Sequence, residues 1–249
     1  MNSASGVLPV AAAVTFPLSP PAEGAAGPPD LRLAAGLPTL SLPMPGAPGV
    51  TATLTASPSR PGVLAAATGI TPLAVRGVQG AAVTWSHAGE PELSLVWQEG
   101  PGQWLELRAF PRVPAEHLAG LAKSLAAVPV TAPAPFEFTL VPAGATIDNI
   151  SASAVTFCPP GTTPDESFIG KITVMLGVTA DRSPGRAVDA GGRPATLHTS
   201  GEYTALQVDL GDGRLLVVQS ATAVPLPEPD LLRFAAGITV TPAATPGQG

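Results

Sequence analysis

The sequence predicts an α+β protein of two similar domains in tandem, each a curved antiparallel sheet with one C-terminal amphipathic helix packed on it. Residues 75–129 repeat the order of elements found in 188–242, at an offset of 113. Within each copy, short alternating segments joined by Gly- and Pro-rich turns indicate antiparallel strands. Each copy then ends in a Leu/Ala-rich segment of helical period. A helix laid on an antiparallel sheet buries the apolar faces of both.

Repetition at this length favours two domains over a solenoid of short units. We expect the first domain to span residues 39–130 and the second 136–243, joined by a proline-rich linker. Residues 1–38 combine an apolar start with a Pro/Ala/Gly-rich stretch, and 244–249 form a short polar tail. Such compositions are typical of linkers, so we expect both ends to be disordered.

In the first domain, the Leu/Val-rich segments alternate with turn residues, and strands are expected over 50–55, 62–67, 81–86, 92–98 and 103–109. Along 92–98, the period of two places Leu93, Leu95 and Trp97 on one face. A helix is expected over 114–126 because Pro114 suits a first helical turn. Its apolar stripe follows at i, i+3, i+4 and i+7, as Leu118, Leu121, Ala122 and Leu125.

The second domain repeats this pattern, with strands expected over 136–142, 150–157, 171–178, 194–199, 203–210 and 214–220. Its helix is expected over 227–239. Leu231, Phe234, Ala235 and Ile238 occupy the same four stripe positions as in the first helix. This coincidence of helical phase is the strongest internal indication of a duplication.

The charge balance excludes some partners. A net charge of −6 argues against nucleic acid, whose phosphates require clustered Lys and Arg. The closest arginines, Arg182, Arg186 and Arg193, lie in a Gly/Pro-rich stretch beside Asp181 and Asp189. We interpret that stretch as a solvated loop rather than an anion site.

Residues able to carry chemistry are few. The single cysteine, Cys158, excludes an intramolecular disulfide and a Cys-based zinc cluster, and its apolar surroundings predict a small buried side chain. His87, His117 and His198 have no partner at metal-ligand spacing, and no phosphate-binding loop or nucleophile elbow occurs. We therefore predict no metal, no cofactor and no catalytic residue.

The amino terminus allows two interpretations. Residues 6–16 are apolar but too few to span a bilayer, and no positive charge precedes them. They read equally well as an apolar tail and as the distal half of an export or anchor segment. The second interpretation makes the protein extracytoplasmic, either secreted or tethered to the membrane at or before its N-terminus. The first leaves a cytoplasmic location open.

All three tryptophans fall in the first domain. Trp97 alternates with the core, whereas Trp104 faces the opposite way, beside Glu106 and Arg108. Amphipathic aromatics on a solvated sheet face suit contact with a ligand or partner. Trp104, Trp85 and Arg108 are therefore the candidate contact residues. The simpler alternative is that Trp104 covers an exposed patch or packs on the neighbouring domain.

A family resemblance rests on the closing hairpin and helix of each copy. These are ALQVDLGDGRLLVVQS with DLLRFAAGI (205–220 and 230–238), and LVWQEGPGQWLEL with EHLAGLAKSL (95–107 and 116–125). They resemble uncharacterised actinobacterial extracytoplasmic proteins with LolA/RseB-like modules, a type found in lipoprotein carriers and anti-sigma-factor-associated proteins. The resemblance implies a curved antiparallel half-barrel with the helix packed inside, and it carries no catalytic residue.

Three functions follow from these observations. The first is a non-catalytic extracytoplasmic binding, sensing or interaction module, with a protein or a hydrophobic small molecule as its partner. The alternatives are a LolA-like carrier of a hydrophobic ligand and a hydrolase with a spatially assembled site. An apolar cavity above about 300 Å³ between helix and sheet would favour the carrier. A pocket joining a His, an acid and a hydroxyl would favour the enzyme, and a filled interface the interaction module.

Overall fold

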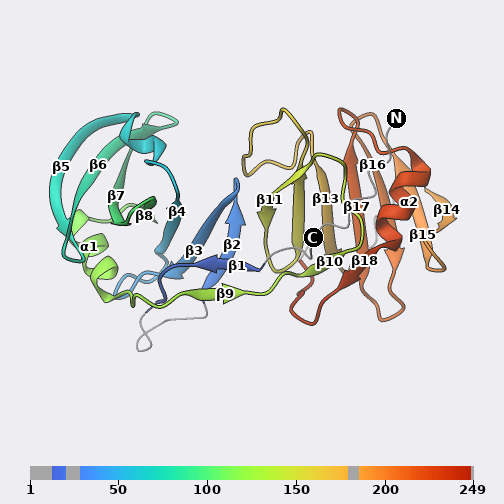
Figure 1. Cartoon of the computed structure of the whole chain (residues 1–249), viewed down its shortest axis with the longest axis horizontal. Coiled ribbons are helices and arrows are strands. Elements are labelled where there is room, and N and C mark those ends of the chain that lie inside the picture. Colours follow the sequence, from blue (N-terminus) through green and yellow to red (C-terminus); the bar gives the residue numbers. More distant parts are fainter. Residues whose placement is uncertain (1–12, 21–28, 179–184, 248–249) are drawn as a thin grey trace. The chain divides into compact units, whose positions relative to one another are not determined.

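The computed structural model describes residues 13–20, 29–178 and 185–247, which form two compact units (Figure 1). The N-terminal unit holds residues 15–32 and 37–132. The C-terminal unit holds 33–36, 133–249 and the residues before Thr15. In each unit, antiparallel strands accompany a single α-helix among the described residues, so the α+β class predicted from the sequence is confirmed.

The N-terminal unit is a sheet in the order β2-β3-β4-β8-β7-β6-β5. The bounds are β2 Asp30–Ala34, β3 Leu37–Pro43, β4 Thr51–Ser57, β5 Ala67–Val75, β6 Val78–His87, β7 Glu90–Gly100 and β8 Gln103–Phe110. A short 3₁₀ helix, η1 (Gly62–Leu64), precedes β5. Strand β1 (Val14–Phe16) pairs separately with β9 (Val130–Ala132).

The C-terminal unit is a sheet in the order β11-β12-β13-β17-β16-β15-β14. The bounds are β11 Thr146–Ile150, β12 Ala154–Cys158, β13 Ile172–Gly177, β14 Arg186–Asp189, β15 Pro194–Thr199, β16 Tyr203–Asp209 and β17 Leu215–Ala221. Here β10 (Phe136–Phe138) pairs with β18 (Ile238–Val240). Leu33, in the part of β2 that belongs to this unit, pairs with Ile150. The two sheets therefore have the same strand order, in which β2 corresponds to β11, β3 to β12, and so on through β8 and β17.

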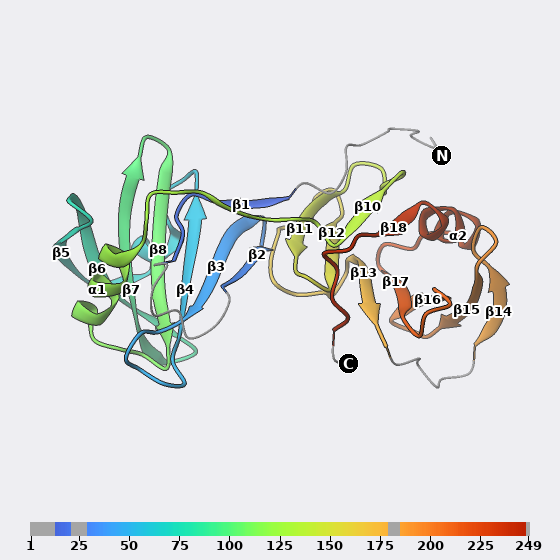
Figure 2. The ribbon, with the colours of Figure 1, turned by 90° about the horizontal axis from the view of Figure 1, so that it is seen from below.

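One helix covers each sheet. α1 (Ala115–Ser124) begins after Pro114, and α2 (Glu228–Ala236) begins after Pro227 and lies across the curved strands β13–β17 (Figure 2). All eight predicted stripe positions are buried, from Leu231 and Ala122 at 0% to Phe234 at 5%. The two helices and the burial of their apolar stripes therefore agree with the sequence prediction, but both helices end earlier than expected. Leu125 is extended, and Ile238 lies in strand β18 (Ile238–Val240).

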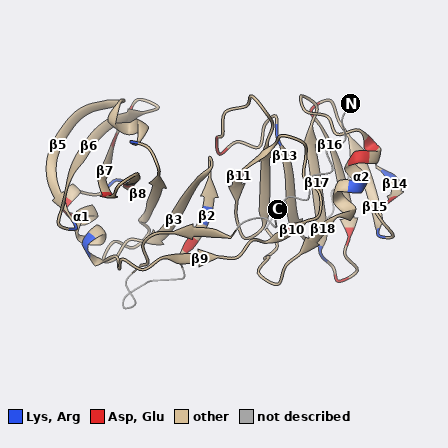
Figure 3. Ribbon diagram, in the orientation of Figure 1, with Lys and Arg blue, Asp and Glu red and all other residues tan. Residues whose placement is uncertain are grey.

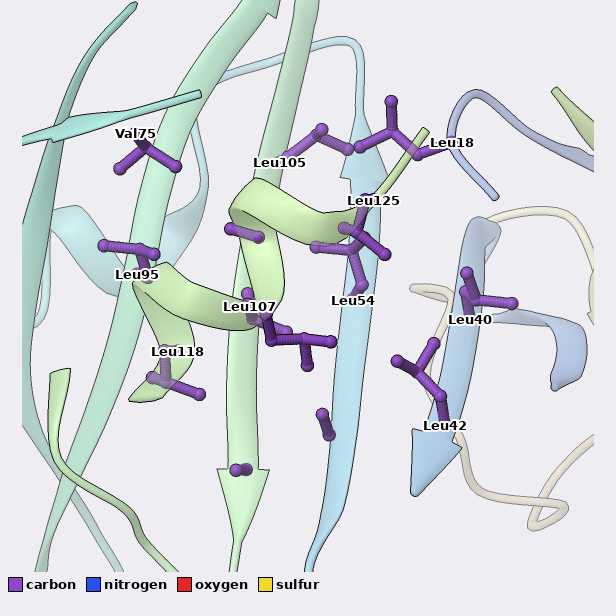
Figure 4. Close-up of a cluster of buried hydrophobic side chains, with 14 of the residues drawn as sticks. Leu18, Leu40, Leu42, Leu54, Val75, Leu95, Leu105, Leu107, Leu118 and Leu125 are labelled. Atoms are coloured by element: carbon purple, nitrogen blue, oxygen red, sulfur yellow. The ribbon is translucent and has the colours of Figure 1, made fainter. Parts of the chain in front are cut away.

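The core of the N-terminal unit lies between α1 and its sheet. Leu95, Leu105 and Leu107 of the sheet meet Leu118 and Leu125 from the helical segment (Figure 4). Along β7, Leu93, Leu95 and Trp97 all belong to this cluster, as the period of two predicts. Val96 points to the other face, where it forms a second small cluster with Val63 and Val83.

Three expected strands differ in the structure. The strand expected over 136–142 ends at Phe138. Residues 62–67 were expected as one strand, but η1 occupies their first half and β5 begins only at Ala67. The N–H of Ala65 bonds to the carbonyl of Gly62 at 2.9 Å, so a helical turn after Pro61 competes with the extended form. Residues 150–157 are two strands, because Ser151 Oγ accepts the N–H of Ala154 at 3.1 Å and closes a turn between them.

The ends of the chain are more ordered than expected. Strands β1 and β2 and the start of β3 fall inside 1–38, and 244–247 add two backbone bonds from Thr245 and Gly247 to Ala152 and Leu176. The Pro/Ala/Gly-rich composition did not reveal these pairings, which provide hydrogen-bond partners for backbone groups of both ends. The rest of both predicted disordered ends (1–12, 21–28 and 248–249) lies outside the described residues.

Candidate functional site

The candidate contact residues lie on the face of the N-terminal sheet opposite α1. Trp85 in β6 and Trp104 in β8 are half-buried and pack against the cluster of Val63, Val83 and Val96. Trp85 Nε1 donates to Ser94 Oγ at 3.1 Å. Both rings therefore keep an exposed edge on a support of fixed side chains.

The structure brings two of the three candidates together. Arg108 pairs in register with Ser94, the residue that Trp85 contacts, and the Arg108 side chain is exposed. Trp85 lies opposite Glu92 and Trp104 opposite Gln98, positions about 20 Å apart along β7. Trp85 and Arg108 thus form one end of the surface, and Trp104 forms the other.

An acid lies between these ends. Ser94 Oγ donates to Glu106 Oε1 at 2.8 Å, which extends the line of polar contacts from the indole of Trp85. The face therefore presents aromatic edges, a guanidinium and a carboxylate. This mixture is typical of a protein-contact surface, where aromatic residues and Arg are enriched.

A second feature lies at the end of α1. Arg76, in the β5–β6 turn, donates from Nε to both carboxylate oxygens of Glu99, at 3.1 and 3.2 Å. Its Nη1 donates to the carbonyls of Ala122, at 2.9 Å, and Leu125. Trp97 Nε1 donates to Glu99 at 2.6 Å. Arg76 thus satisfies carbonyls that the end of a helix leaves open.

A groove of about 550 Å³ opens beside this turn. Most of the side chains that line the groove are small, and Arg76 and Lys123 are cationic. The lining residues are Ala74, Arg76, Gly77, Ala119, Gly120, Lys123 and Leu125. The Arg76 charge is already balanced by Glu99, whereas Lys123 is exposed. The groove can accept an apolar group with a negative charge beside it.

The third feature is a buried ion cluster in the C-terminal unit. Lys171 Nζ donates to Asp148 Oδ2, to Asp165 Oδ1 at 2.6 Å and to the Asp165 carbonyl at 2.8 Å. The side chains of Lys171 and Asp148 are each 1% exposed. Asp148 stands where the register of β11 against β12 shifts, so the irregularity in the strand directs its carboxylate into the unit.

The pKa values in this cluster follow from its contacts. Burial alone would lower the pKa of Lys171, but the hydrogen bonds and charges of Asp148 and Asp165 outweigh it, so the pKa is raised. The hydrogen bond from Lys171 lowers the pKa of Asp165. Burial raises the pKa of the nearby Cys158 thiol, which is 1% exposed as its apolar surroundings predicted.

The histidines occupy separate environments. His87 and His117 are exposed, and His198 is buried in β15. Neither ring nitrogen of His198 has a hydrogen-bond partner among the described residues. Within those residues, no group of three His, Cys, Asp or Glu side chains is placed to hold a metal ion.

Sequence reasoning missed the contacts of two arginines and the ion cluster. Arg186 is 60% exposed, as a solvated position predicts, but it lies in strand β14, and Arg193 lies in the turn that follows. Arg193, expected in a solvated loop, donates to the carbonyl of Ala235 at the end of α2 at 2.6 Å, and Arg186 pairs with Glu228 at 2.6 Å. Asp181 and Arg182 lie outside the described residues. The one signal for the cluster was a lysine directly before an apolar strand, in a chain with only two lysines.

The chain has a distant structural neighbour among known proteins. No family model and no curated protein sequence matches the chain. Among solved structures, it is similar to the crystal structure of MucB in complex with MucA(peri), at 12% identity and a TM-score of 0.26. The match covers 85% of this chain and 92% of that one. A likeness this distant carries no function across, and the LolA/RseB-type membership suggested by the sequence stays a prediction.

Charged side chains are sparse and of mixed sign in both units (Figure 3). None of the helices in the described ranges is both long and apolar enough to cross a bilayer.

Proposed function

We propose that this protein is a non-catalytic extracytoplasmic interaction module that binds a protein partner through the tryptophan face of its N-terminal unit. The supporting observation is the filled interior beneath each helix. Leu118 is 1% exposed and shares a cluster with Leu95 and Leu107 of the facing strands, and Leu231 and Ala235 are 0% exposed. With the helix–sheet interfaces packed, binding is left to the outer surfaces. The extracytoplasmic placement rests on the apolar segment at residues 6–16.

The carrier is the second candidate, because the α1 groove exceeds the volume of a small ligand pocket. It ranks lower since the groove opens beside α1 instead of lying beneath it, and since Arg76 and Lys123 line it. A lipid chain favours enclosed apolar walls. Titration with a fluorescent fatty acid separates the two: a carrier binds it stoichiometrically, and the interaction module does not.

We also propose that the two units are tandem copies of one ancestral unit. The same strand order in both supports this. So does the matched helix cap, because Arg76 bonds to Ala122 and Arg193 to Ala235, two carbonyls separated by the offset of 113. An experimental structure in which the two sheets and helices superpose strand for strand would support the duplication, and differing strand orders would rule it out.

The proposed contact face is tested by affinity capture from the extracytoplasmic fraction of the source organism. The bait is the whole chain, compared with Trp104→Ser and Arg108→Glu. A protein captured by the wild type and lost with both variants identifies the partner and the face. Val128, 56% accessible in the connection between α1 and β9, lies outside the sheet and supplies the control variant Val128→Ser, which should keep the partner. Equal capture by every variant would contradict the assignment.

A further inference from the structure

The β12–β13 connection of the C-terminal unit exposes two large apolar side chains. Phe168 is 55% accessible and Ile169 is 88% accessible. Ser167 Oγ accepts the N–H of Ile169 at 3.0 Å, and the N–H of Ser167 donates to Asp165 Oδ1 at 2.9 Å. The local turns therefore hold this apolar pair, called here the tip, in an outward position.

The buried ion cluster anchors the loop that carries the tip. Lys171 binds both the side chain and the carbonyl of Asp165, and Asn149 Nδ2 donates to the same carbonyl at 2.9 Å. Moving the charges of Lys171 and Asp148 out of water costs free energy. Well-packed apolar residues in their place would often make the unit equally stable or more stable. The cluster thus fixes the loop shape instead of merely filling the unit.

The fold itself does not require this loop. In the N-terminal unit, the connection between the corresponding strands β3 and β4 takes only residues 44–50, and the Met44 N–H closes it by donating to the Val50 carbonyl at 2.8 Å. In the C-terminal unit it runs over 159–171. An extra segment that is firmly anchored and exposes apolar side chains is typical of a binding loop.

The groove beside α1 has the complementary chemistry. Its walls of Ala and Gly leave about 550 Å³ for apolar side chains, and the exposed Lys123 lies at its rim. Glu166, exposed beside the tip, supplies the matching negative charge. Opposite charges at the rim of an apolar contact select the partner and its orientation.

We propose that the tip of one molecule, Phe168 and Ile169, inserts into the α1 groove of a second copy, with Glu166 facing Lys123. The contact joins two different surfaces, so each chain carries one tip that inserts and one groove that receives the tip of another chain. It is separate from the tryptophan face, and neither proposal depends on the other.

A bilayer is the competing occupant, and the charges disfavour it. Glu166 and Asp165 lie next to the tip, and acidic residues are repelled by anionic lipid surfaces. Two apolar side chains alone also give only marginal membrane binding, which usually needs a second signal.

The test measures self-association by sedimentation velocity, with the whole chain at concentrations up to about 1 mM. The wild type should associate with increasing concentration. Phe168→Ser with Ile169→Ser, and separately Lys123→Glu, should each weaken association by about 30-fold or more, as expected for central contacts. The chain with both Glu166→Lys and Lys123→Glu should regain it, because the charges are exchanged. Ile70→Ser is the matched control and should behave as wild type.

Mixing gives the sharper result. The tip variant keeps its groove and the Lys123→Glu variant keeps its tip, so the two together should form a 1:1 dimer although each alone stays monomeric. A wild type that stays monomeric throughout, or a mixture that does, would overturn the proposal. So would tip-dependent co-sedimentation with vesicles of phosphatidylcholine and phosphatidylglycerol, which would show a membrane contact instead.

Discussion

Lys171 is a charged residue in a place that water hardly reaches, and its three contacts go to Asp148 and Asp165. Removing one partner of a buried pair leaves the other charge without compensation. Lys171→Met should therefore lower the free energy of unfolding by roughly 3–5 kcal/mol, measured by urea denaturation. The control is Arg214→Met, which breaks a solvent-exposed pair with Asp212 and should change the free energy of unfolding far less, because water screens that pair. Equal losses in both variants would contradict the buried role of Lys171.

The same cluster predicts a dependence on pH. The pKa of Asp165 lies below its ordinary 3.8 because of the hydrogen bond from Lys171. A carboxylate with a lowered folded pKa contributes stability that is present above the unfolded value and lost as pH falls through the folded one. Between neutral pH and pH below 3.8, the wild type should thus lose more stability than Asp165→Asn. Parallel acid denaturation curves would show that the contact with Lys171 contributes nothing.

The burial of individual side chains could be predicted where apolar residues recur at a regular spacing along the sequence. Leu95 and Trp97 were placed correctly by alternation along β7, and Cys158 by its apolar neighbours. Asp148 was not, because its inward direction depends on an irregular register between two strands. Its ion pair also joins residues 23 apart, a separation at which no periodic pattern links them.

At the scale of elements, an arginine from a neighbouring hairpin caps the end of each helix. Arg193→Met removes one charged hydrogen bond to Ala235, so it should cost about 1.5–3 kcal/mol. Arg76→Met should cost more, because Glu99, with its side chain 19% exposed, also loses its cation. Adding Glu99→Gln to Arg76→Met should recover part of that difference in thermal denaturation. Additive losses would show that the pair is not coupled.

Both helices and strands such as β7 and β16 were predicted well because their periods are local, whereas the nine-residue strand β5 was not expected. The short strands β1, β9 and β18 were missed and β10 is shorter than expected, since their pairing partners lie more than 100 residues away. The offset of 113 also fails for the closing hairpin. Leu95 pairs with Leu107, whereas Val208 pairs with Leu216, so the second hairpin is shorter and β17 follows β8 at a different offset.

At the scale of the whole molecule, the two units have separate cores, each closed by its own helix. Leu121 belongs to the cluster beneath α1, and Phe234 stacks with Phe138 at 6.0 Å between ring centroids and meets Phe157 edge-on at 5.8 Å. Domains with their own cores can unfold as separate cooperative steps. We therefore expect calorimetry to show two unfolding transitions.

Matched core truncations assign these transitions. Leu121→Ala should lower only one midpoint, at a cost of roughly 2–5 kcal/mol, and Phe234→Ala should lower only the other, at roughly 3–5 kcal/mol. Each variant is the control for the other, since both leave a cavity beneath a helix of the same kind. If the two substitutions shift a single common transition, the units unfold together, and two independent cores are then the wrong description. If each shifts its own transition, stability can be tuned in the unit with the tryptophan face without disturbing the unit with the anchored loop.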